Sequence, residues 1–164
     1  MLKFEHNNLN LFKFVLMSFG KSKLDELLQR GKLLKELDAW YSAFNDLTKK
    51  QLIYWVQDQL QEGKDGNDVL MGTYSYATEL ISKGRKRQGD NYTFEDTGYF
   101  YDSMQVYVSE YLIEVTGDGQ KDNENLYTKY SQFLTTLNDE HIEKLKTIIN
   151  KAYIDYIRKI LRIN

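Results

Sequence analysis

The first half of the chain carries the hydrophobic pattern of amphipathic helices. Apolar residues recur at spacings of three and four over residues 24–44, which predicts a helix that packs on one face. These residues are Leu24, Leu27, Leu28, Leu33, Leu34, Leu37, Trp40, Tyr41 and Phe44. Gly31 can interrupt the helix, and Ser22 is predicted as its N-cap because Asp25 and Glu26 follow.

A second helix is predicted from near Thr48 to just before Gly63. Its apolar residues are Leu52, Ile53, Trp55, Val56 and Leu60. Residues 2–19 alternate poorly, and Phe12, Phe14 and Leu16 suit either a strand or an arm that docks on a neighbouring molecule. The apolar run at residues 11–19 is broken by a lysine and is too short for a signal peptide or a membrane span, so we expect the protein to be made in the cytosol.

The centre of the chain predicts an antiparallel hairpin. Residues 105–109 and 111–115 alternate and are rich in β-branched and aromatic side chains, with a tight turn at Ser109 and Glu110. Before them, residues 63–97 combine glycine-rich turns, a short helical patch from Tyr74 to Ile81, and a basic loop. A stretch this long in a compact domain is usually functional or mobile.

The C-terminal part returns to helical periodicity. Leu126, Tyr127, Tyr130, Phe133 and Leu134 predict a short helix. A long last helix follows, with Asn138 or Asp139 as its cap, and its wide apolar stripe predicts burial along much of its length. The stripe consists of Ile142, Leu145, Ile148, Ile149, Ala152, Tyr153, Tyr156, Ile157, Ile160 and Leu161. The predicted fold is therefore α+β: N-terminal helices, a central antiparallel hairpin or small sheet, and a long C-terminal helix.

Composition narrows the functional classes. With 164 residues the chain can bury a core without metals or disulfides, and its net charge of −2 gives no bulk indication of a nucleic-acid or membrane partner. The absence of cysteine excludes disulfides, thiolate metal sites and cysteine nucleophiles. The thirteen tyrosines fit either partly wet protein interfaces or the codon bias of a low-GC genome.

Residues 72–108, GTYSYATELISKGRKRQGDNYTFEDTGYFYDSMQVYV, carry a resemblance to a known family. The matching residues are Gly63, Gly66, Tyr74, Ser75, Thr78, Lys83, Gly84, Lys86, Gly89, Asp96, Thr97, Gly98, Phe100, Tyr101, Ser103 and Met104, followed by the closing helix TTLNDEHIEKLKTIINKAYIDYIRKIL. This order resembles the head–tail connector and tail-completion proteins of tailed bacteriophages, including crAss-like phages and prophages of Bacteroides-type gut bacteria. The resemblance covers roughly residues 50–164 and does not include the first 45 or so.

The resemblance implies a structural virion protein that forms a ring in the phage neck or tail and joins or seals head and tail. Residues 46–164 would form the connector-like domain, and residues 1–45 an N-terminal arm with helices. The expected partners are copies of the same chain and portal, connector or tail proteins, with DNA passing nearby unbound, in the virion after assembly in the host cytoplasm. No catalytic residue, cofactor, metal or membrane is implied. We predict subunit interfaces at Tyr74, Lys83, Arg85, Lys86, Arg87, Phe100, Tyr101, Tyr107 and Tyr111.

Other chemical interpretations of single motifs are weaker. Asp96-Thr97-Gly98 predicts a capped short helix at residues 99–104, with Gly98 allowing close backbone approach, rather than an aspartic-protease motif. The basic loop at residues 83–87 suits a solvated surface, or it pairs with acidic patches on neighbouring subunits. It could also bind the phosphates of a nucleic acid, so the alternative function is a nucleic-acid-binding phage regulatory protein.

The sequence evidence for a metal site is equally weak. The segment with Asp65, Asn67 and Asp68 resembles part of a calcium-binding loop, but the glycine and the glutamate that such a loop requires are misplaced. The segment therefore predicts a turn. His6 and His141 are expected to be solvent-exposed.

Overall fold

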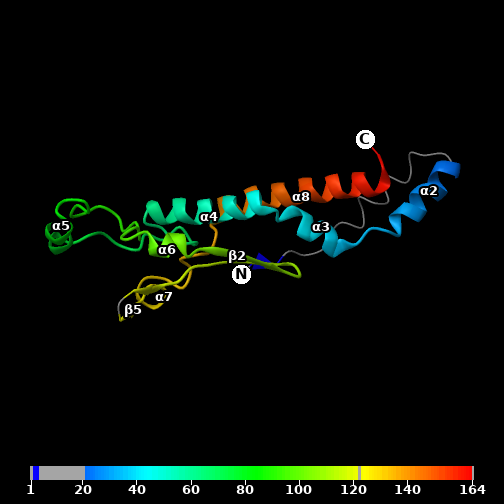
Figure 1. The fold of residues 1–164 in the computed structure, drawn as a ribbon. Coiled ribbons are helices and arrows are strands. Elements are labelled where there is room, and N and C mark those ends of the chain that lie inside the picture. Colours follow the sequence, from blue (N-terminus) through cyan, green and yellow to red (C-terminus); the bar gives the residue numbers. More distant parts are fainter. Residues whose placement is uncertain (1, 4–20, 122, 164) are drawn as a thin grey trace. The chain divides into compact units, whose positions relative to one another are not determined.

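The computed structural model describes residues 2–3, 21–121 and 123–163, and within them it confirms the α+β class (Figure 1). The elements are β1 (Leu2–Lys3), α2 (Lys21–Gly31), α3 (Glu36–Ala43), α4 (Asp46–Gln61), α5 (Tyr76–Ser82), α6 (Tyr99–Asp102), β2 (Gln105–Ser109), β3 (Leu112–Thr116), β4 (Gln120–Lys121), β5 (Glu124–Asn125), α7 (Leu126–Lys129) and α8 (Asp139–Leu161). None of the described helices is long and apolar enough to cross a membrane. The predicted strand or arm around Phe12 and Phe14 lies outside the described residues, as does His6.

The chain divides into two compact units. Unit 1 comprises Met1–Asn45, Val108–Ile113 and Leu145–Asn164, and unit 2 comprises Asp46–Tyr107 and Glu114–Lys144. Unit 2 begins at the same residue as the predicted connector-like domain. The tip of the β2–β3 hairpin and most of α8 nevertheless belong to unit 1, so neither unit is continuous in sequence.

Trp40 organises unit 1. It is almost fully buried, and its indole Nε1 donates a hydrogen bond of 2.8 Å to the carbonyl of Ser109 at the hairpin tip. Its ring also contacts Phe44 and Tyr111, with centroids at 4.8 Å and 5.8 Å. The predicted interruption at Gly31 is confirmed, since α2 ends there. The predicted cap was wrong, because α2 already starts at Lys21 and Ser22 lies inside it.

The central sheet has the strand order β1-β3-β2, so β2 is an edge strand. β1 runs antiparallel to β3, with Leu2 opposite Ile113. The predicted hairpin is confirmed, but its turn lies one residue later than expected. Tyr111 occupies this turn in a left-handed conformation (φ 57°) and does not begin the second strand.

A buried polar network crosses the core of unit 2, where α4 meets the start of α8. The side chain of Gln59 donates to the carbonyl of Thr136 (3.0 Å) and accepts from the backbone N–H of Asn138 (3.0 Å) and from Nδ1 of His141 (2.8 Å). The ring of His141 also stacks on Trp55, with centroids at 5.2 Å and an interplanar angle of 11°. We call Gln59, Asn138 and His141 the Gln59 network. The expected exposure of His141 was wrong, because its side chain is 6% exposed.

α8 is capped as predicted but is less buried than predicted. The side-chain oxygen of Asn138 accepts the backbone N–H of His141 at 3.0 Å, which satisfies one of the free donors of the first turn. Along the helix only His141, Leu145, Ile149 and Leu161 are buried, whereas the apolar side chains between residues 150 and 160 are half-exposed or exposed. A helix that packs along one line buries about one residue per turn. The buried face of α8 is therefore narrower than its apolar stripe.

The segment between α4 and α6 has local structure of its own. Asp65 folds a turn by accepting the backbone N–H groups of Asn67 (2.9 Å) and Val69 (3.1 Å), so the prediction of a turn is confirmed. α5 occupies the predicted helical patch, is capped by the Ser75 hydroxyl, and ends at Lys83 in a left-handed conformation. Figure 1 shows α5, in green, projecting from the rest of unit 2.

Candidate functional site

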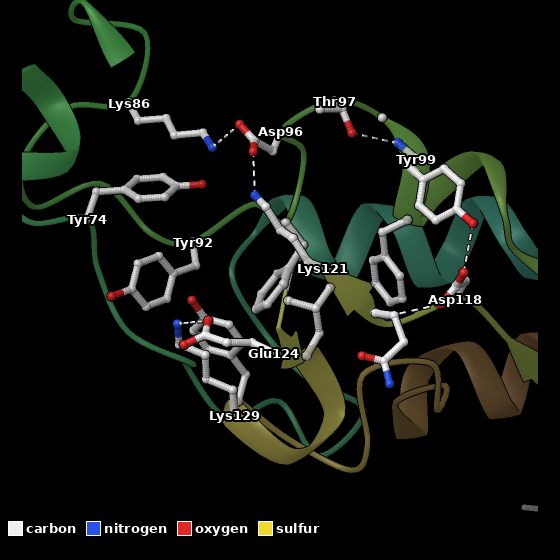
Figure 2. A pocket seen from close by; sticks show the side chains of 16 residues that line it. Tyr74, Lys86, Tyr92, Asp96, Thr97, Tyr99, Asp118, Lys121, Glu124 and Lys129 are labelled. Atoms are coloured by element: carbon white, nitrogen blue, oxygen red, sulfur yellow. Dashed lines mark hydrogen bonds and ion pairs between the residues drawn. The ribbon is translucent and has the colours of Figure 1, made fainter. Parts of the chain in front are cut away.

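Unit 2 contains a cavity of about 400 Å³ whose wall combines aromatic rings with lysines and carboxylates (Figure 2). Its lining comes from the loops on both sides of α5, from α6, and from the region of β4, β5 and α7. The lining residues are Tyr74, Lys86, Tyr92, Phe94, Asp96, Thr97, Gly98, Tyr99, Phe100, Asp118, Gln120, Lys121, Glu124, Leu126, Lys129 and Tyr130. We call this feature the aromatic cavity.

Aromatic rings that meet nearly at right angles form one wall. Tyr92 lies edge-on to Tyr74 (5.0 Å, 78°) and to Tyr130 (5.3 Å, 69°), and Phe94 is nearly perpendicular to Tyr130 (4.9 Å, 89°). An antiparallel bridge between Thr73 and Asn91 brings the two ends of the α5 segment together and so places these rings side by side.

The backbone at this wall is strained. Phe94 adopts φ 56°, which costs a bulky residue roughly 1–3 kcal/mol and persists only where its surroundings enforce it. The phenolic oxygen of Tyr74 contributes to this restraint, since it accepts the backbone N–H of Thr93 at 3.1 Å.

Asp96 joins two segments at the rim of the cavity. Its carboxylate accepts hydrogen bonds from Nζ of Lys121 and from Nζ of Lys86, the latter at 2.8 Å (Figure 2). These ammonium groups lower the pKa of Asp96 to about 2, with the bond from Lys121 as the largest cause, so the carboxyl is charged across the physiological range. Nζ of Lys86 also lies 5.5 Å from the centroid of the Tyr74 ring.

Two further pairs complete the rim. The hydroxyl of Tyr99 donates to Oδ2 of Asp118 at 2.7 Å, and this bond raises the pKa of Tyr99 and lowers that of Asp118. Lys129 donates to Glu124, which raises the pKa of Lys129, and its ammonium lies 5.5 Å from the centroid of the Tyr130 ring.

The residues predicted to form subunit interfaces fall into separate groups. Tyr74, Phe100 and Tyr101 are buried within the chain itself and offer little surface to a neighbouring subunit. Their burial was not foreseen, because the sequence does not reveal whether an aromatic residue in a loop faces the core. Burial also raises the pKa of Tyr101, whose hydroxyl donates to the carbonyl of Thr93 at 2.5 Å.

The other predicted interface residues are more accessible. Tyr107 on β2 is exposed, and Tyr111 in the hairpin turn is half-exposed. In the basic loop, Lys83, Arg85 and Arg87 are exposed. Lys86 belongs to the aromatic cavity through its bond to Asp96, so the loop does not act as one solvated charge run.

The Asp96-Thr97-Gly98 motif starts a short helix, α6, close to the predicted position. Thr97 Oγ1 accepts the backbone N–H of Tyr99 at 3.4 Å, whereas Asp96 binds lysines and does not cap the helix. Gly98 is required for its left-handed backbone (φ 83°), not for close approach, since an added Cβ would meet only Asp102 at 3.6 Å. An aspartic protease needs a second carboxyl that shares a proton with the first, and a carboxyl held by two ammonium groups does not fit that role.

Comparisons of the chain with known protein families, with curated proteins and with solved structures find no match. The expected relationship to phage connector proteins therefore depends on the sequence resemblance alone. Within the described ranges, no group of three or more His, Asp or Glu side chains could hold a metal ion.

Sequence reasoning missed most of the aromatic cavity. It singled out Tyr74, Lys86, Asp96 and Phe100 for other reasons and gave Tyr99 and Tyr130 only a place in a predicted helix. It assigned no role to Tyr92, Asp118 or Lys121. One usable signal was the spacing of Tyr92 and Phe94 just after the basic loop. In an extended segment, residues two apart point to the same side, so these two rings are expected to line one surface. The pairing of Asp96 with lysines before and after it in sequence has no local signature.

Proposed function

We propose that the chain is a structural subunit of a tailed-phage particle that forms a homo-oligomeric ring in the neck or tail. The observation that carries the proposal is the edge strand β2, whose side chains alternate between exposed and half-buried. An edge strand offers its backbone groups to a strand from another chain, and proteins that stay monomeric usually block such edges.

The sheet has two different edges, which suits a ring. A closed ring requires a head-to-tail interface in which two different surfaces of the subunit meet. The order β1-β3-β2 places β2 at one edge and β1 at the other. Pairing of β2 in one copy with β1 in the next would extend the sheet around the ring.

Exposed apolar side chains on α5 also support contact with other chains. Tyr76, Leu80 and Ile81 are all exposed on this seven-residue helix. Adjacent exposed apolar residues on a soluble protein commonly mark an interaction surface. The alternative of nucleic-acid binding through residues 83–87 has weaker support, because Lys86 is held by Asp96.

The mass of the purified full chain, measured by native mass spectrometry, tests the ring. We expect one discrete oligomer, and we expect Tyr107→Lys to shift it to the monomer because a charge on an edge strand opposes pairing. Tyr54→Lys is the matched control, since Tyr54 on α4 is 59% exposed and Tyr107 is 57% exposed. A chain that stays monomeric at its highest soluble concentration contradicts the proposal, as does an equal effect of the two substitutions.

A further inference from the structure

The charges around the aromatic cavity balance one another. Three lysines (Lys86, Lys121 and Lys129) and three carboxylates (Asp96, Asp118 and Glu124) line it. Both lysines at Asp96 and the lysine at Glu124 are engaged in ion pairs at its rim. A strongly charged ligand of either sign would meet like charges as often as opposite ones, so it would gain little net attraction.

The same rim contains both hydrogen-bond donors and acceptors. The ammonium groups donate only, the carboxylates accept only, and Gln120 adds a side chain that does both. A hydroxyl group can donate to a carboxylate and accept from an ammonium group at the same time. A neutral ligand with several hydroxyl groups therefore matches this rim better than a ligand with one kind of polar group.

Tyr99 presents a rigid aromatic face although it is exposed. The residue is 57% exposed, and its hydroxyl donates to Oδ2 of Asp118. Asp118 is itself held, because Oδ1 accepts the backbone N–H of Gln120 (3.0 Å) and its own N–H donates to Oγ of Ser103 (2.8 Å). A ring fixed before binding loses little entropy on contact, so it is a favourable platform for the apolar C–H face of a sugar ring.

From these features we propose that the aromatic cavity binds a neutral carbohydrate. The C–H face of the sugar packs on Tyr99, and its hydroxyls bond to the carboxylates, the ammonium groups and Gln120 of the rim. The cavity of about 400 Å³ lies within the range of roughly 300–1,000 Å³ that small-molecule sites occupy. The proposal goes beyond the ring, and since every residue involved lies in unit 2, a monomer would present the same site.

A quaternary ammonium ligand is the main competitor, because perpendicular aromatic rings also form cages for such cations. Here the chain supplies its own cations to the rings. The ammonium of Lys86 lies 5.5 Å from the ring of Tyr74, and that of Lys129 lies 5.5 Å from the ring of Tyr130. A ligand cation would have to displace these groups, whereas a neutral sugar can bind beside them.

Ligand-observed saturation-transfer NMR on the full chain tests the proposal with maltotriose, cellotriose and triacetylchitotriose as neutral probes. We expect saturation of the ring C–H protons of at least one trisaccharide, with roughly tenfold weaker binding in Tyr99→Ala, equivalent to about 1.4 kcal/mol. Tyr76→Ala is the matched control, since Tyr76 is 58% exposed on α5 and does not line the cavity. Circular dichroism of both variants verifies that they are folded.

Several outcomes overturn the carbohydrate site. One is that none of the three trisaccharides shows saturation transfer, and another is that Tyr99→Ala, while folded, binds as well as the unaltered chain. Tighter binding of choline or of inorganic phosphate than of every trisaccharide would also refute it, because it would show that charge governs recognition. The mass measurement of the ring is unaffected by any of these results, so the two proposals fail separately.

Discussion

Unit 2 contains two clusters of polar side chains that differ in their access to water. In the Gln59 network, Gln59, Asn138 and His141 are all buried, and their side chains bond to one another, to backbone groups and, through Nδ2 of Asn138, to the carboxylate of Asp68. In the aromatic cavity, the side chains of Lys86, Asp96 and Lys121 remain 21%, 39% and 48% exposed. Hydrogen bonds centred on Gln59 therefore hold the buried cluster, and ion pairs in contact with water hold the exposed one.

The difference separates a structural role from a binding role. A buried polar group without a partner carries the full cost of its desolvation, so a network in which every buried group is paired strongly favours one arrangement of the chain. No buried polar side-chain atom in the described parts of the chain lacks a hydrogen-bond partner. Exposed ion pairs add little stability because water competes for each charge, and for the same reason they can exchange partners with a ligand.

Gln59→Ala should give the largest effect, because it removes the centre of the buried network. The substitution leaves the carbonyl of Thr136, the backbone N–H of Asn138 and Nδ1 of His141 without their partner. We expect the free energy of unfolding to fall by about 3 kcal/mol, since each orphaned buried group costs about 1–3 kcal/mol. Urea denaturation at neutral pH measures the loss.

Gln57→Ala is the matched control on the same helix. Gln57 is half-buried, and its side chain donates a hydrogen bond from Nε2 to the carbonyl of Tyr101 at 3.3 Å. We expect a loss of about 1 kcal/mol or less for this single bond. Equal losses for Gln57→Ala and Gln59→Ala would show that burial of the Gln59 network adds nothing to stability. The contrast between the buried network and the exposed cavity would then be wrong.

The elements of the fold could be predicted from sequence more reliably than the two polar clusters. Apolar periodicity and caps are local signals, so α4, the hairpin and the Asn138 cap of α8 appear where the pattern puts them. The exposure of a polar residue depends on what packs against it from distant parts of the chain. His141 therefore looked like a surface residue, although Gln59, 82 positions away, provides its partner.

The candidate site illustrates the same limit. Tyr74, Phe100 and Tyr101 could be singled out as aromatic residues in a conspicuous segment, but sequence does not tell a buried ring from an exposed one. The ion pair between Lys121 and Asp96 spans 25 positions and joins a loop to β4. Only the folded chain shows that these residues share a cavity.

A smaller change in the free energy of unfolding is expected when His141 of the buried network is protonated at low pH. Burial, followed by the charge of Lys144, lowers the pKa of His141 below its ordinary value near 6.5. The unfolded chain then binds the proton more readily than the folded chain, so the stability provided by His141 is complete above pH 6.5 and is lost as the pH falls through the folded pKa.

Unfolding free energies at pH 7.5 and pH 5.5 reveal this dependence. The unaltered chain should lose more stability between these conditions than His141→Asn, which keeps a side-chain donor but does not titrate. All other ionisable groups are common to both proteins, so the difference between them reports His141. A His141→Asn variant with the same pH dependence as the unaltered chain would mean that the buried histidine accepts a proton without cost.

The smallest effect should come from the exposed cluster, through Asp96→Asn. This substitution removes the negative charge that pairs with both Lys86 and Lys121, yet we expect a loss below about 1 kcal/mol, because exposed ion pairs contribute about 0–1 kcal/mol. The loss should shrink further in about 1 M NaCl, where the screening length falls to roughly 3 Å. Asp90→Asn, at an exposed carboxylate near the same loop, provides the control. If Asp96→Asn destabilised the chain as much as Gln59→Ala, the cavity charges would be structural like the buried network, and the case for a rim that can exchange its partners with a ligand would be lost.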